Sequence, residues 1–151
     1  MEEQKTTSFF RFEDLRVYDK SMDYYSWLLN QTKEADDFSK KALLMPFLDT
    51  AAKVAMNIAD GSSNHKMEFV EYLKFAKSNV RQCVVYTSMA LKNGIFSEEQ
   101  SNVSREMLVE LTKMIGAMIV SFQRGHKYNN HQEQEFNKEP DFSTESMEFN
   151  Y

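Results

Sequence analysis

The sequence predicts an all-α protein, built as an antiparallel up-down four-helix bundle. The 151 residues include only 4 Gly and 2 Pro, which is too few for the many turns of an all-β fold. Apolar residues recur at steps of three and four through four long segments, the spacing that buries one face of a helix. The connections between these segments are short, and short connections favour antiparallel neighbours.

The chain divides into three predicted regions. We expect an N-terminal extension at 1–12, a four-helix bundle domain at 13–124 and an acidic, disordered tail at 125–151. The tail holds six acids and two lysines, a net charge of −4, so the rest of the chain carries only −1 of the total of −5. Aromatic residues lie among the tail acids, and the tail either docks on a partner or stays solvated: Phe136, Phe142, Phe149 and Tyr151.

The first helix is expected from about Glu13 to Thr32, and the second from about Lys40 to Asp60 with Ser39 as its N-cap. The predicted buried seam of the first helix is Leu15, Tyr18, Met22, Tyr25 and Leu29. Pro46 either begins the second helix or kinks it. The predicted buried stripe of the second helix is rich in alanine, which permits close helix approach: Leu44, Leu48, Ala51, Ala52, Ala55 and Ile58.

The third helix is expected from about His65 to Asn93, and Gly94 is placed to end it in the left-handed conformation. Ser97 and Gln100 form a capping box for a fourth helix that runs to about Arg124. The third helix buries Phe69, Tyr72, Leu73, Ala76, Val80, Cys83, Thr87, Ala90 and Leu91. The fourth buries Val103, Met107, Leu111, Met114, Met118 and Phe122.

The sequence contains no recognisable reactive constellation, so we predict no enzyme activity, no cofactor and no metal site. The histidines lie at helix ends, and the carboxylate and histidine spacing of di-iron bundles is absent. Glycine-rich phosphate loops and hydrolase motifs are absent as well. The single cysteine, Cys83, falls on the buried arc of the third helix, where a small hydrophobic residue is favoured over a nucleophile.

The first residues, MEEQKTTSFF, lack the basic start and apolar run of a signal peptide. No segment approaches the ~20 apolar residues that cross a bilayer, and one cysteine rules out an internal disulfide framework. We therefore expect a cytoplasmic protein that does not bind membranes.

The basic residues of the third helix share one flank of about 80° when the helix turns ~100° per residue. Such a stripe can follow a phosphate backbone, because lysine and arginine release counterions there. The competing interpretation is a solvated flank that is partly paired with acids. The candidate nucleic-acid-binding residues, for RNA or DNA, are Lys66, Lys74, Lys77, Arg81 and Lys92.

Apolar residues exceed what one buried stripe requires. Phe75, Val85 and Tyr86 lie outside the main stripe of the third helix, and Trp27 and Leu28 add to that of the first. A second apolar face on a bundle helix suggests a subunit interface. We therefore predict that the protein associates with itself.

The stretch NIADGSSN, residues 57–64, is either a site or a tight corner between two helices, and we favour the corner. Asn57 lies one turn before the glycine, where its amide can bond a neighbouring helix or the free backbone groups of the turn. Asp60 precedes Gly61, the expected left-handed residue after the helix. The next residues offer N-caps for the third helix: Ser62, Ser63 and Asn64.

Three motifs in this order resemble the protein family encoded by intervening sequences of bacterial 23S rRNA genes. The first is F-x-x-L, at Phe12 to Leu15, and the second is A-x-N-I-A-[ED]-G, at Ala55 to Gly61 with Asp60 in place of the commoner glutamate. The third places E-F-x-x-[FY]-L-x-x-A-x-x-S on a helix, from Glu68 to Asn79, with a serine one position early. The resemblance covers about residues 9–124.

The resemblance implies a fold and partners that the residues alone do not. It implies a pentamer of antiparallel bundles, arranged as a ring or barrel with a central pore. A retroelement member of the family is strongly basic and binds its reverse transcriptase and nucleic acid. We therefore expect a non-enzymatic oligomeric scaffold that contacts RNA or DNA and a protein such as a reverse transcriptase. The alternative is a protein-interaction module that binds no nucleic acid.

Overall fold

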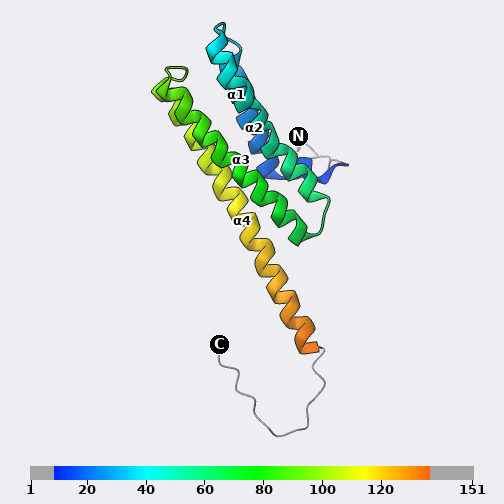
Figure 1. The fold of residues 1–151 in the computed structure, drawn as a ribbon. Coiled ribbons are helices and arrows are strands. Elements are labelled where there is room, and N and C mark those ends of the chain that lie inside the picture. The colour runs from blue at the N-terminus through cyan, green and yellow to red at the C-terminus, as the bar shows by residue number, and fades with distance from the viewer. Residues whose placement is uncertain (1–8, 137–151) are drawn as a thin grey trace, which may run out of the picture.

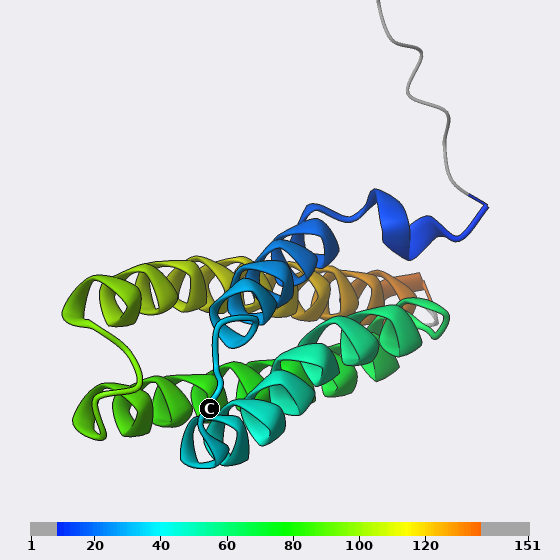
Figure 2. The same ribbon diagram turned by 90° about the horizontal axis from the view of Figure 1, so that it is seen from above.

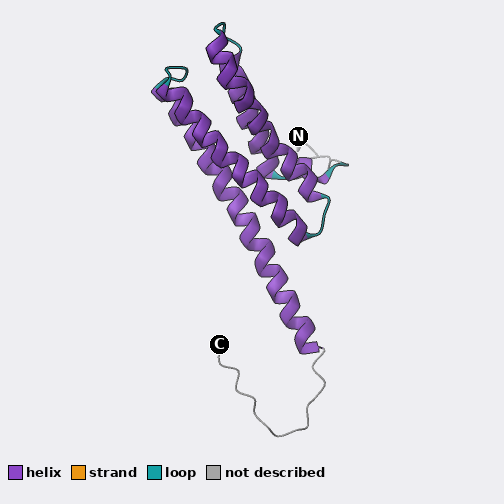
Figure 3. Cartoon of the chain, viewed as in Figure 1, coloured by secondary structure: helices purple, strands orange, loops and turns teal. Residues whose placement is uncertain are grey.

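A computed structural model describes residues 9–136 and contains four α-helices. A short 3-10 helix, η1 (Arg11–Asp14), is followed by α1 (Arg16–Thr32), α2 (Phe38–Ser62), α3 (Lys66–Lys92) and α4 (Glu98–Phe136). The described part of the chain holds no strand (Figure 3), so the predicted all-α class is confirmed.

The helices pack mainly on their neighbours in sequence. α2 contacts α1 and α3, α3 contacts α4, and α1 also contacts α4. The chain doubles back at each of the three connections (Figure 1), and α1 crosses obliquely over the others when seen from above (Figure 2). η1 packs on α1 and α2, so the residues before the first long helix belong to the folded body.

The buried face of α1 differs from the predicted seam. Val17, Ser21, Tyr24 and Leu28 are buried, whereas Met22 of the predicted seam is 42% exposed. α1 is apolar on two adjacent faces, so the spacing alone did not decide which face turns inward. The core is drawn from all four helices, and its largest members are Tyr24, Phe47, Leu28, Ile58, Leu73, Leu108, Leu111 and Ile115.

α2 starts earlier than predicted. Its N-cap is Asp37, whose side chain accepts a 2.9 Å hydrogen bond from the backbone N–H of Ser39, so Ser39 lies inside the helix and is not its cap. Pro46 is therefore an interior residue of α2, two turns from its start. The hydroxyl of Thr50 donates a 3.0 Å hydrogen bond to the Pro46 carbonyl.

By length and composition alone, α2 is apolar enough to cross a membrane, which the sequence analysis did not anticipate. Many of its apolar side chains nevertheless lie inside the protein, among them Phe47, Val54 and Ile58, and α2 packs on α1 and α3. The central helix of a folded core has the same composition as a membrane span. We therefore interpret α2 as the core helix of this fold.

The connection between α3 and α4 follows the prediction. Gly94 has a φ of 68°, the left-handed conformation expected after a helix. The backbone N–H of Ser97 donates to Gln100 Oε1 at 2.8 Å, and the N–H of Gln100 donates to Ser97 Oγ at 3.1 Å. The capping box that begins α4 is thus formed from both sides.

α4 is longer than predicted, because it continues from Arg124 to Phe136. The prediction that the disordered tail begins at residue 125 is therefore wrong for residues 125–136, and residues 137–151 lie outside the described part. This extension lacks apolar periodicity but carries local side-chain hydrogen bonds. Gln132 bonds Tyr128 at 2.8 Å and Asn130 bonds His126 at 3.2 Å, each pair one turn apart.

Gly61 has a different role from the one predicted. It lies within α2, is buried, and does not have the positive φ of a residue that ends a helix. A Cβ at this position would lie 2.5 Å from Tyr72 Cβ and 2.7 Å from Phe69 Cδ2, both on α3. The glycine is therefore required by the close approach of α2 and α3.

The polar residues around Gly61 hold this corner together. Asn57 Nδ2 donates a 2.8 Å hydrogen bond to Asn79 Oδ1 on α3, so the predicted bond to a neighbouring helix is present. Ser62, Ser63 and Asn64 bond backward to carbonyls of α2 and do not cap α3. His65 occupies the N-cap position of α3 without a side-chain cap.

A buried hydroxyl cluster joins α1, α3 and α4. Tyr24 Oη lies 2.9 Å from Ser104 Oγ, and Thr87 Oγ1 lies 2.7 Å from the same oxygen. Thr87 also bonds the Cys83 carbonyl at 2.8 Å. Every hydroxyl in the cluster has a partner, and this satisfies the main requirement for burying polar groups.

The close approach at Gly61 can be tested with Gly61→Ala. The new methyl group would meet the Cβ of Tyr72, which is fixed to the α3 backbone, so the helices must separate. We expect a loss of about 2–3 kcal/mol in the free energy of unfolding, measured with urea. Gly116→Ala is the matched control, because no atom lies within 4 Å of its Cβ position in α4. That control should be neutral or stabilising by up to about 1 kcal/mol, and equal effects at both positions would contradict the account.

Candidate functional site

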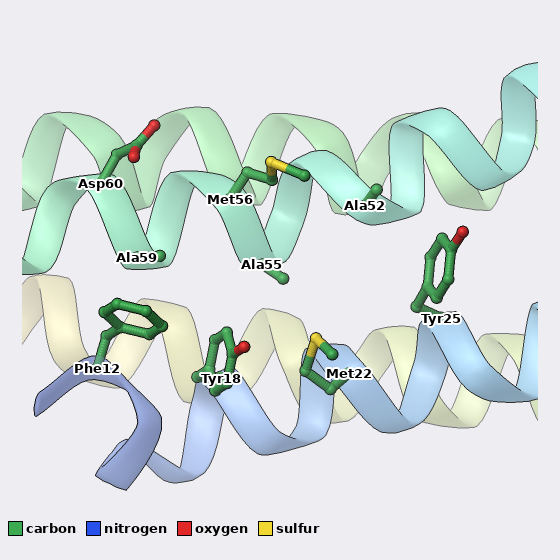
Figure 4. Close-up of a pocket in the computed structure, with 9 residues that line it drawn as sticks. All are labelled: Phe12, Tyr18, Met22, Tyr25, Ala52, Ala55, Met56, Ala59 and Asp60. Atoms are coloured by element: carbon green, nitrogen blue, oxygen red, sulfur yellow. The ribbon is translucent and has the colours of Figure 1, made fainter. Parts of the chain in front are cut away.

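An apolar groove of about 420 Å³ lies between α1 and α2 and is closed at one end by η1 (Figure 4). Its aromatic and methionine side chains come mainly from η1 and α1, and its alanines all come from α2. The lining residues are Phe12, Tyr18, Met22, Tyr25, Ala52, Ala55, Met56, Ala59 and Asp60.

The groove is suited to apolar side chains of another molecule. Small alanines leave room on the α2 side, while Met56 is 64% exposed at its edge. Among the described residues that line the groove, Asp60 alone is charged, and it lies at the same end as Phe12 (Figure 4). The lining is otherwise mainly apolar and aromatic, so the groove is suited to binding by burial of apolar surface.

Sequence reasoning missed this groove because it assigned Tyr18, Met22 and Tyr25 to the core. The signal was nonetheless present in the family motifs. Phe12 belongs to the first motif, and Ala55 and Ala59 belong to the second. Reading the two motifs as facing one another would have located the groove.

The predicted basic stripe on α3 separates into a central group and two ends. Lys74, Lys77 and Arg81 line a shallow hollow of about 410 Å³ together with Ser78, Gln82 and Val85. Lys74 is paired with Glu71 at 3.2 Å, within α3. The described residues provide no ion pair to Lys77 or Arg81, so these two cations are available to a ligand.

The remaining predicted cations lie away from the hollow. Lys66 begins α3, and its Nζ is 5.9 Å from the centre of the Phe122 ring on α4. Lys92 is the last residue of α3. The structure therefore does not bring the five predicted residues together as one continuous site.

Two of the surplus apolar residues on α3 are exposed: Phe75 is 58% exposed and Val85 is 53% exposed. Val85 lines the hollow, whereas Phe75 is not among its lining residues and its ring centre lies 6.3 Å from that of Tyr72. Tyr86 instead stacks on Phe47 of α2, with ring centres 5.2 Å apart. We use the name basic face for Lys74, Lys77, Arg81 and Val85.

Cys83 is a free thiol in the core. It is fully buried, and burial raises its pKa to about 12. Burial likewise raises the pKa of Tyr24. Within residues 9–136 no three histidine, cysteine, aspartate or glutamate side chains are grouped as metal ligands would be.

Comparison with known proteins agrees with the three motifs. Residues 13–117 match the model of the family described as 23S rRNA-intervening sequence protein. The chain belongs to this family. The match covers the first three helices and about half of α4, so both the groove and the basic face lie almost wholly within it.

A solved structure of another protein shares the fold. It is a protein of unknown function from the S23 ribosomal protein family of Bacteroides thetaiotaomicron, 15% identical, with a TM-score of 0.63. The similarity covers 68% of this chain and 94% of that one. At this identity the likeness supports the fold alone. No match was found among curated proteins.

The buried thiol predicts how stability depends on pH. Because the folded-state pKa of Cys83 is raised above its ordinary value of 9.0, the unfolded chain loses its proton first as the pH rises. The free energy of unfolding should therefore fall by about 1.4 kcal/mol per pH unit between pH 9 and 12 from this group. Tyr24 adds a loss of the same sign above pH 10. Urea unfolding of Cys83→Ala should show a shallower decline, and an unchanged slope would contradict the assignment.

Proposed function

We propose that this protein is a non-enzymatic helical scaffold that assembles with copies of itself. Its four helices form an antiparallel up-down bundle, and the bundles join into a closed ring. The observation that carries the proposal is the exposed groove between α1 and α2, lined by residues of two family motifs.

Burial of this groove would stabilise an assembly. Met22 and Met56 both expose large apolar side chains at the groove, and each buried methylene contributes about 0.8 kcal/mol. A ring requires each copy to present two different complementary surfaces, one to each neighbour. The groove supplies one surface, and its opposite must come from another part of the bundle.

The groove can be tested as an interface with Met56→Glu. This side chain is largely exposed in the single chain, so the substitution should leave folding intact while placing a charge in the buried interface. We expect the association constant of the assembly to fall at least about tenfold, as measured by sedimentation at several protein concentrations.

Met56→Leu is the matched control, because it keeps an apolar side chain of similar size at the same exposed position. It should leave the mass unchanged. A wild-type protein that is monomeric at every concentration would refute the proposal, as would equal dissociation in both variants.

Nucleic-acid binding is a second candidate function. It is favoured by the unpaired Lys77 and Arg81 at the exposed hollow on α3. Two cations on a chain of net charge −5 support weak binding that depends strongly on salt. A protein partner such as a reverse transcriptase is a further proposal, which the family resemblance suggests. A scaffold that binds no nucleic acid remains the alternative.

The double variant Lys77→Glu/Arg81→Glu tests this candidate. We expect weaker binding to a single-stranded RNA probe at low salt, with the salt slope reduced by about 1.4, because each phosphate contact on a single strand contributes about 0.7. Fluorescence anisotropy at several salt concentrations measures both quantities. Lys41→Glu, in the first turn of α2 and outside the hollow, is the control and should change little. Wild-type protein that does not bind the probe at low salt would exclude this function.

A further inference from the structure

The acidic end of the chain has no role in the functions proposed so far. Residues 137–151, NKEPDFSTESMEFNY, contain four acids and one lysine, a net charge of −3. The segment also contains three aromatic residues: Phe142 lies between the acids, and Phe149 and Tyr151 follow the last of them. A segment that combines acids with aromatic residues suits a surface that is both cationic and apolar.

The basic face of α3 has that combination. Lys77 and Arg81 are cations without an acid partner among the described residues. Lys74 is a third cation, which forms an ion pair with Glu71. Val85, which is 53% exposed, adds apolar surface within the same hollow. Charge and apolar character on this face thus complement those of residues 137–151.

The geometry of α4 determines which copy the segment can reach. α4 passes the start of α3 at Phe122, beside Lys66, lines a hollow with that end of α3 as far as Asn129, and then extends to Phe136 (Figure 1). At 1.5 Å per residue the stretch from Phe122 to Phe136 is about 21 Å long. The basic face lies in the opposite direction, from Lys74 to Arg81, about 12–22 Å along α3 from Lys66. The end of α4 is therefore about 33–44 Å from the basic face of its own chain.

This separation disfavours binding within one chain. Fifteen residues reach about 50 Å only when fully extended, whereas a flexible chain of that length has a mean end-to-end distance of about 21 Å. Binding to its own face would require an almost straight segment, at a large loss of conformational entropy. The described end of α4 projects away from the basic face of its own chain, which favours the basic face of a second copy.

We infer that residues 137–151 of one copy bind the basic face of α3 on a second copy. Glu145 and Glu148 meet Lys77 and Arg81, while the aromatic residues cover Val85. One such contact is weak, because surface ion pairs are screened by salt. Repeated around an assembly, the contacts strengthen one another through local concentration. The bound segment would also exclude nucleic acid from the same face.

A photo-cross-linking experiment on the full chain tests this inference. The change Phe149→benzoylphenylalanine places the reactive group in the segment, and equal amounts of ordinary and ¹⁵N-labelled protein are mixed before illumination. Mass spectrometry then identifies the cross-linked residues and shows whether they join one chain or two. We expect cross-links to residues 74–85, about half of them between light and heavy chains.

Variants of the face supply the controls. Lys77→Glu/Arg81→Glu should reduce these cross-links at least about fivefold, as should high salt, whereas Lys41→Glu should leave them unchanged. Cross-links confined to single chains, or directed to other residues, would overturn the inference. This experiment identifies which residues are in contact, whereas the groove proposal is tested by the mass of the assembly. A negative result here is therefore distinguishable from failure of the groove proposal.

Discussion

The close contact between α2 and α3 at Gly61 sets the geometry of the rest of the protein. The absence of a side chain at Gly61 lets Phe69 and Tyr72 lie directly against the α2 backbone. One turn of α2 before Gly61, the hydrogen bond from Asn57 to Asn79 also joins the two helices. With α2 committed to α3 on this side, its alanine-rich side faces α1 and forms the floor of the groove. The outer surface of α3, which carries the basic face, is left to solvent.

The two candidate surfaces therefore arise from one packing arrangement but lie on different helices. The groove is almost entirely apolar and is suited to burying the surface of another protein. The basic face is mixed, with cations beside the exposed apolar Val85, and is suited to polyanions or acidic segments. A change in one surface should leave the other intact. The second family motif takes part in both the packing and the groove. Its Gly61 packs against α3, and its Ala55 and Ala59 line the groove.

The sequence predicted most of the fold and little of the site, for physical reasons. The capping box at Ser97 and the left-handed Gly94 were predicted correctly because they depend only on nearby residues. The buried face of α1 was assigned wrongly because its two apolar faces have similar composition, and only packing on α4 through Tyr24 and Ser104 decides between them. Gly61 was given a local role when its role comes from a neighbouring helix. The groove was missed because it depends on how η1, α1 and α2 meet, which only the pairing of the first two family motifs signals in the sequence.

The central claim is that copies of this protein meet through the groove between α1 and α2. Methionine oxidation by a dilute peroxide pulse measures this directly, because Met22 and Met56 are exposed in the single chain and line the groove, while Met89 is exposed on α3 outside it. We predict that oxidation of Met22 and Met56 slows as protein concentration rises, with Met89 unchanged as the internal reference. Oxidation of Met22 and Met56 at a rate independent of concentration, in a protein whose mass shows assembly, would contradict the account.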